Sequence, residues 1–311
     1  MKSLLQNKKS RRITLLLILA ILTLIFLIRV YIVPNFHPTL TEGVVSEEPI
    51  WHALTARLLD SIFVSLFVTA AIALFMFYIE VPDEDKKFDI LESMRLHEIF
   101  EAELSHTDSW HFSGGMGRHT RSKTIPTMDK MAKASNQHKS LKIQLLNPSD
   151  NKLCSDYANY RASLRSANNK NSAWNEKFVR REILSTILVA AIFKANNSNF
   201  EISVKLKAAF STLRIDLGSK TAIITKEDKN EPALVCRDGS FLFRSYKEEL
   251  AQTYKIYNDL DIHVQGGYSL GTITSKDVAN LLLILKLDDG LTDDDCKAIA
   301  KTLKENKNPY A

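Results

Sequence analysis

Residues 108–118 read Asp-Ser-Trp-His-Phe-Ser-Gly-Gly-Met-Gly-Arg. The first half of this stretch is typical of a short β-strand, and the glycines that follow are typical of a tight turn. A helical pattern covers 124–136. A second strand pattern over 141–146 is stopped by Asn147-Pro148. A strand, turn, helix and strand in this order predict an α/β domain.

The surrounding sequence extends this pattern in both directions. Further strands are expected at 200–206, 212–217, 221–225, 233–236 and 240–243, the last two around an Asp238-Gly239 hairpin turn. Further helices are expected at 88–104, 150–166 with Asp150 as its cap, 173–195, 246–257, 275–287 and 293–305. We therefore expect a connecting helix within 81–104, an α/β sensor domain over 105–258 and a C-terminal helical extension over 259–311.

Two long apolar runs precede this domain, at 13–33 and 58–80. A helix of about 20 apolar residues can cross a hydrocarbon layer of about 30 Å. The runs therefore predict two transmembrane helices, joined by a short external loop over 34–57. A cleaved signal peptide is the alternative interpretation of the first run.

Basic residues predict the orientation of these helices. The tail over 1–12 carries five lysine and arginine residues and no acid, whereas the loop over 34–57 has three glutamates and one arginine. The positive-inside rule then predicts a two-pass membrane protein, with both termini cytoplasmic and the lipid bilayer as a partner.

The second run contains small residues at every fourth position: Ser61, Ser65, Thr69 and Ala73. Such a stripe allows close approach between helix backbones. It predicts either a homo-oligomer formed through these helices or packing against the first run. The absence of a mid-membrane acid in either run argues against a transporter or pump.

The composition sets further bounds on the class of protein. The chain has 311 residues, is 45% hydrophobic and 25% charged, and carries a net charge of +5. Its 10 glycines and 8 prolines are too few for a collagen-like or largely disordered chain. Three scattered cysteines provide neither a disulfide framework nor a zinc-binding pair.

Charge gathers in one part of the predicted domain. Residues 111–181 contain 14 lysine and arginine residues but only four acids. Such segregation is typical of an anion-binding face, although an ordinary solvated surface is the alternative. Glycine turns let backbone amides approach a phosphate, and arginines can clamp it. The predicted partner- or anion-binding site consists of Gly114, Gly115, Gly117, Arg118, Arg121, Arg161 and Arg165.

The sequence gives no basis for a catalytic centre, a metal site or a cofactor. The glycine turn is not a Walker loop, because no Gly-Lys-Ser/Thr follows it, and it does not match G-x-G-x-x-G. The histidines lack metal-ligand spacing, and no G-x-S-x-G elbow is present. We assign no catalytic residue and expect a non-enzymatic protein.

The order of elements over 105–258 resembles a phospholipase D-like domain, in which each half of the sequence would supply half of the sheet. The first half carries the glycine turn and the strand that ends in Leu146-Asn147-Pro148. The second carries Arg214-Ile-Asp-Leu, Ile223-Ile-Thr and Gly239-Ser-Phe-Leu-Phe. That family uses an HxKxxxxD motif, and no histidine here is followed by lysine two positions later. The resemblance therefore implies a degenerate domain that senses or binds.

The layout of two apolar runs before a sensor-sized domain resembles the two-transmembrane effectors of bacterial anti-phage systems, of the type associated with retrons. This resemblance implies a toxin of an abortive-infection system, held inactive by a reverse transcriptase and its RNA–DNA product. On release it would disrupt the inner membrane. A membrane effector gated by a cyclic nucleotide, a membrane-anchored enzyme acting on phosphodiesters and an anchored scaffold remain as alternatives.

Overall fold

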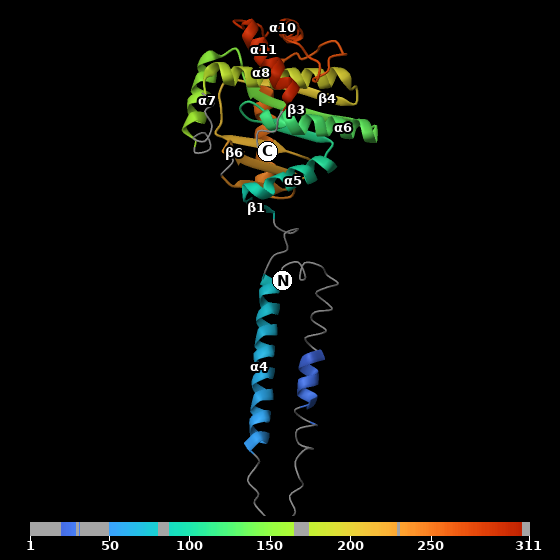
Figure 1. Cartoon of the computed structure of the whole chain (residues 1–311), viewed down its shortest axis with the longest axis vertical. Coiled ribbons are helices and arrows are strands. Elements are labelled where there is room, and N and C mark those ends of the chain that lie inside the picture. The colour runs from blue at the N-terminus through green and yellow to red at the C-terminus, as the bar shows by residue number, and fades with distance from the viewer. Residues whose placement is uncertain are drawn as a thin grey trace, which may run out of the picture. The chain divides into compact units, whose positions relative to one another are not determined.

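The computed structural model describes residues 20–28, 31, 50–79, 87–164, 174–228 and 231–306. The chain divides into two compact units, Met1–Asp85 and Lys86–Ala311. In the first unit, helical residues 20–28 accompany α4 (Ile50–Ile79), a helix of 30 residues. Figure 1 shows the two helical segments side by side. The ring centroids of Phe26 and Phe63, one from each segment, lie 6.5 Å apart.

A search of the described residues finds no helix that is both long and apolar enough to span a membrane. For the described residues, the predictions of two transmembrane helices and of a two-pass inner-membrane protein are therefore wrong. The predicted loop over 34–57 and tail over 1–12 lie largely or wholly outside these residues.

The second unit is built on one mixed sheet of eight strands in the order β1-β7-β6-β5-β2-β3-β4-β8. The pairs β2–β3 and β3–β4 are parallel, and all other neighbouring strands are antiparallel. The strands are β1 (Phe88–Leu91), β2 (Ser109–Ser113), β3 (Lys139–Leu146), β4 (Phe200–Lys207), β5 (Leu213–Leu217), β6 (Thr221–Lys226), β7 (Ala233–Arg237) and β8 (Asn258–Leu260).

Helices connect and cover these strands, as Figure 1 shows. They are α5 (Ser93–His106), a π-helical turn (Thr120–Thr124) continuing into α6 (Ile125–Ser135), α7 (Asn151–Ser163), α8 (Glu176–Asn196), α9 (Phe241–Ile256), α10 (Ser275–Ile284) and α11 (Asp293–Glu305). Helical crossovers join the parallel strands β2, β3 and β4, so the carboxyl ends of these strands lie at one edge of the sheet. Because β6 is antiparallel to β5, which is antiparallel to β2, β6 also ends at this edge.

The sheet separates two apolar cores. The larger contains Trp110, Phe112 and Ile143 from the strands and most of the buried face of α8. The smaller lies against α9, where Phe243 and Leu250 pack on residues of β5, β6 and β7. Alternation of side chains along each strand produces both cores, since successive residues point to opposite faces.

Six expected strands, β2 to β7, lie within two residues of the predicted ranges, and Asp150 caps α7 by accepting a hydrogen bond from the Leu153 N–H at 2.9 Å. Two expectations are wrong. The predicted strand over 240–243 is the start of α9, where Ser240 Oγ accepts from the Phe243 N–H. The predicted helix over 88–104 begins as β1, which pairs with β7 and is followed by α5.

The predicted fold class is also wrong in its phospholipase D-like half-sheet pattern. β2 from the first predicted half pairs directly with β5 from the second, through His111–Leu217 and Ser113–Ile215. The two halves therefore form one continuous eight-stranded sheet. Two helices after residue 259, α10 and α11, do follow the sheet as expected.

Candidate functional site

The glycine turn lies at the carboxyl edge of the parallel strands, where ligands of open α/β sheets usually bind. The turn continues the pairing with β3: the Gly114 N–H donates to the Gln144 carbonyl, and the Gly115 carbonyl accepts from the Leu146 N–H, both at 3.2 Å. A Cβ on Gly115 would lie only 2.2 Å from Tyr157 Oη. Glycine is therefore required at 115 for close approach of α7.

A carboxylate of the chain itself occupies this turn. The Gly115 N–H donates to Glu227 Oε1 at 2.9 Å, and the Tyr157 hydroxyl donates to Oε2. Arg161 Nη1 lies 2.9 Å from Oε2 and also donates to the Glu227 backbone carbonyl. Three donors from two segments thus converge on Glu227, the first residue after β6.

Burial gives Glu227 an unusual titration. Desolvation raises the pKa of its carboxyl from 4.5 to about 7, while the Gly115 amide and the positive charge of Arg118 favour the ionised form and oppose this rise. Burial outweighs these favourable contacts. Glu227 is therefore a titrating carboxyl at the edge of the sheet, a role that nothing in its local sequence indicates.

Two of the predicted arginines pair with another buried acid, Glu182 of α8. Arg118 Nε lies 3.2 Å from Glu182 Oε2, and Arg121 Nη2 lies 2.9 Å from the same oxygen. The Arg121 side chain is only 3% exposed, whereas that of Arg118 is 32% exposed. Arg121 therefore forms a buried ion pair with Glu182, whereas Arg118 remains accessible to a partner.

An aromatic ring lies near each of two predicted arginines, Arg118, whose side chain is 32% exposed, and Arg161, whose side chain is 11% exposed. The Arg161 guanidinium lies 4.8 Å from the Trp174 ring centroid, and that of Arg118 lies 6.0 Å from Phe178. Trp174 and Phe178 meet edge to face at 5.2 Å. The neighbouring residue of α7, Tyr160, stacks on Phe210 at 5.5 Å with an interplanar angle of 28°. We call these six partly exposed residues the arginine–aromatic cluster: Arg118, Tyr160, Arg161, Trp174, Phe178 and Phe210.

The structure thus brings together six of the predicted site residues: Gly114, Gly115, Gly117 and Arg118 at the turn, the buried Arg121 close by, and Arg161 on α7. Gly114 completes the turn, and Gly117 adopts a φ of +68°, which favours glycine. Arg165 lies outside the described residues. Sequence reasoning missed the aromatic members and Glu227, although Trp174 and Phe178 are four residues apart at the start of a helix.

The predicted packing stripe lies in the other unit, on α4. Ser61, Ser65 and Thr69 are exposed there, and the Thr69 hydroxyl donates to the Ser65 carbonyl at 2.8 Å. The Ala73 side chain lies outside the described residues.

A buried lysine ends β4 at the same edge as the glycine turn. Lys207 Nζ lies 3.5 Å from Ser113 Oγ, and desolvation lowers the pKa of its ammonium to about 8. Among the described residues, no carboxylate forms an ion pair with it. The edge therefore holds a positive charge in addition to those of the arginines.

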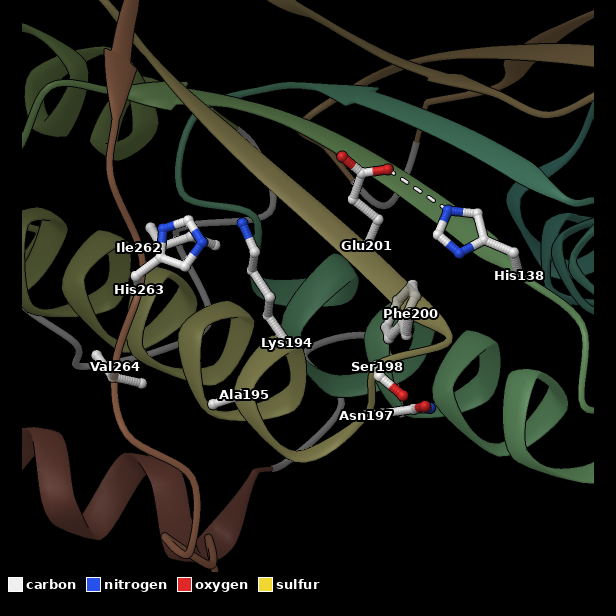
Figure 2. A pocket seen from close by; sticks show the side chains of 10 residues that line it. All are labelled: His138, Lys194, Ala195, Asn197, Ser198, Phe200, Glu201, Ile262, His263 and Val264. Atoms are coloured by element: carbon white, nitrogen blue, oxygen red, sulfur yellow. Dashed lines mark ion pairs between the residues drawn. The ribbon is translucent and has the colours of Figure 1, made fainter.

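A separate cavity of about 310 Å³ lies at the opposite edge, where β4 begins and α8 ends (Figure 2). It is lined by His138, Lys194, Ala195, Asn197, Ser198, Phe200, Glu201, Ile262, His263 and Val264. His138 and Glu201 form an ion pair at 3.4 Å across its rim. Their side chains are 62% and 64% exposed, so the polar groups lie at the mouth of the cavity. Over the described part of the chain, no group of three or more potential metal ligands is found.

Comparisons with known proteins add little to this geometry. No protein-family model matches the sequence, and no curated protein matches it. Among solved structures, the chain is similar to TrmBL2, an archaeal chromatin protein whose structure is described as showing a novel mode of DNA binding. The identity is 10%, the TM-score is 0.32, and the match covers 68% of each chain. A similarity at this level carries no argument about fold or function.

Proposed function

We propose that this chain is a non-enzymatic effector of a bacterial anti-phage abortive-infection system, and that its α/β unit receives the signal by binding a nucleic acid. The proposed partner is a reverse transcriptase together with its RNA–DNA product, which hold the effector inactive. The proposed contact surface is the arginine–aromatic cluster next to the glycine turn.

The observation that carries this proposal is the alternation of guanidinium groups and partly exposed rings within the cluster. Arg161 lies against Trp174 at 4.8 Å, and Tyr160 stacks on Phe210 at 5.5 Å. Proteins bind single-stranded nucleic acids by stacking bases on aromatic rings and placing cations along the phosphates. Trp174 is well suited to this role, because one edge packs on Phe178 while the side chain remains partly exposed.

The charges of the surrounding segment support the same class of partner. Residues 111–181 carry 14 basic residues against four acids. Glu182 and Glu227 neutralise part of this charge internally, through Arg118, Arg121 and Arg161. The remaining excess favours a polyanion over a neutral or basic partner.

A cyclic nucleotide is the second candidate ligand, because it combines one phosphodiester with one stackable base. In Arg161 and Trp174, the cluster offers one guanidinium for a phosphate and one ring for a base, 4.8 Å apart. A longer single-stranded nucleic acid would contact Tyr160 and Phe210 as well. The two ligands therefore differ in how many aromatic residues they require.

The test measures binding to the purified full chain by fluorescence anisotropy, with a labelled RNA–DNA hybrid carrying single-stranded ends and with a labelled cyclic nucleotide. Trp174→Leu is expected to weaken binding of the hybrid by about 1–3 kcal/mol, the usual contribution of one stacked base. Arg118→Gln is expected to reduce the slope of log K against log salt by about 0.7–0.9 if it removes one phosphate contact. Lys301→Gln in α11, an exposed basic residue outside the cluster, is the matched control.

Equal affinity of the three variants would contradict the proposed surface. Hydrolysis of either ligand by the wild-type chain, lost on substitution within the cluster, would contradict a non-enzymatic receiver. In cells, we expect co-expression of the reverse transcriptase and its RNA–DNA product to suppress toxicity of the wild-type chain, and Trp174→Leu to escape this suppression.

A further inference from the structure

The anion-binding position of the glycine turn is already filled. A carboxylate oxygen of Glu227 accepts the Gly115 N–H at 2.9 Å, and the second oxygen receives Arg161 Nη1 at 2.9 Å and the Tyr157 hydroxyl. We propose that Glu227 is an internal substitute for a ligand phosphate, and that a phosphate group of the bound nucleic acid displaces it from these three donors. This inference rests on the function proposed above and assigns the phosphate subsite within it.

The three donors match the chemistry of a phosphate group. A backbone amide next to glycine, a guanidinium and a hydroxyl are the groups that proteins commonly direct at phosphate oxygens. Their convergence on two oxygens of one anion shows that the site is shaped for an oxyanion. The flanking ring of Trp174, 4.8 Å from the Arg161 guanidinium, would stack on the base attached to that phosphate.

Glu227 is held under conditions that favour its exchange. Its carboxyl is buried, and the cost of removing that charge from water raises its pKa to about 7. An incoming phosphodiester keeps its negative charge at all physiological pH values and can extend into solvent, whereas the displaced carboxylate regains its hydration. Above pH 7, the exchange therefore replaces one negative charge beside Arg161 with another.

Displacement would also transmit a signal. Glu227 joins the end of β6 to the glycine turn after β2 and to α7, through Gly115, Tyr157 and Arg161. Removing this carboxylate breaks its bonds to the Gly115 amide and the Tyr157 hydroxyl, while Arg161 still donates to the Glu227 backbone carbonyl. Ligand binding and the position of the segment after β6 are then coupled without any change in the sheet itself.

The test uses the full chain and the variant Glu227→Gln, which keeps the size of the side chain and weakens its competition for the three donors. We expect Glu227→Gln to bind the RNA–DNA hybrid at least about tenfold more tightly than the wild type at pH 8. Asp129→Asn is the matched control, because Asp129 is also a buried acid with an amide donor, Asn197 Nδ2 at 2.7 Å, but lies on α6 away from the turn. Its affinity should equal that of the wild type.

A second variant tests one of the three donors separately. Tyr157→Phe removes one donor to Glu227 and leaves the ring that packs on Phe210. It also removes that donor from the ligand phosphate, so hybrid affinity should change by less than threefold. In a separate titration, inorganic phosphate should compete with the hybrid at lower concentrations in Glu227→Gln than in the wild type. Competition by a cyclic nucleotide but not by phosphate would assign the subsite to a single nucleotide.

The outcomes separate this inference from the proposed function. If the wild type binds the hybrid and Trp174→Leu weakens binding, but Glu227→Gln binds no more tightly than Asp129→Asn, the phosphate subsite is wrong and the proposed surface stands. If neither the wild type nor Glu227→Gln binds any nucleic acid or nucleotide, both are wrong. Tighter binding confined to Glu227→Gln supports both.

Discussion

Replacing Gly115 with alanine tests the structure of the glycine turn directly. The added Cβ would lie 2.2 Å from Tyr157 Oη and 2.3 Å from Cζ, so the ring must move. Tyr157 is fully buried, and such overpacking costs about 1–3 kcal/mol. Moving the ring also breaks its hydrogen bond to Glu227, and a hydrogen bond to a charged group contributes about 1.5–3 kcal/mol. We expect Gly115→Ala to lower the free energy of unfolding by about 3–5 kcal/mol.

The measurement is urea unfolding of the full chain, followed by tryptophan fluorescence, since Trp110 is fully buried in the larger core. Gly271→Ala is the matched control, because a Cβ there meets nothing within 4 Å. It should change the free energy of unfolding by less than about 1 kcal/mol. A loss of unfolding free energy below about 1 kcal/mol for Gly115→Ala would refute the close approach of α7 to the turn. It would also refute the contacts of the Glu227 carboxylate with Gly115 and Tyr157.

Three further substitutions test other parts of the account. Because burial raises the pKa of Glu227 from 4.5 to about 7, the folded state keeps a proton that the unfolded chain releases. The free energy of unfolding should therefore fall by up to about 3 kcal/mol as pH rises from 4.5 to 7. Glu227→Gln should remove this pH dependence in unfolding measured across the same range. Burial lowers the pKa of Lys207 from 10.5 to about 8, so stability should rise between pH 8 and pH 10.5, and an unchanged rise in Lys207→Met would show that another group causes it. Ser240→Ala removes the cap of α9 and should cost about 1 kcal/mol in thermal or urea unfolding, whereas no loss would mean that the Ser240 hydroxyl does not stabilise the helix.

Local patterns predicted most strands of the second unit because those strands have strong apolar alternation. The errors arose where local patterns are ambiguous. Phe241-Leu-Phe has the apolar character of a strand, yet Ser240 has the hydroxyl of a helix cap, and packing against β5–β7 selects the helix. Phe88–Leu91 forms a strand only because β7, more than 140 residues later, supplies its hydrogen-bonding partner.

The candidate site could be predicted only in part, for a similar reason. Glycines after a strand and nearby arginines are visible locally, so Gly115, Arg118 and Arg161 were within reach of the sequence. Glu227 was not, because its role depends on a hydrogen bond to an amide 112 residues away. Arg121 has the same local sequence context as Arg118 and pairs with the same carboxylate, Glu182, so only tertiary packing determines that its side chain is the buried one.

The most direct test of the central claim is photocrosslinking of the full chain to an RNA–DNA hybrid with 5-iodouracil in its single-stranded ends, followed by mass spectrometry of the crosslinked peptides. We expect crosslinks to Trp174 and Tyr160, which present partly exposed rings beside Arg161 at the glycine-turn edge. Crosslinks confined to Tyr246 and Tyr254 of α9, on the other side of the sheet, or to no aromatic residue of the second unit, would contradict it.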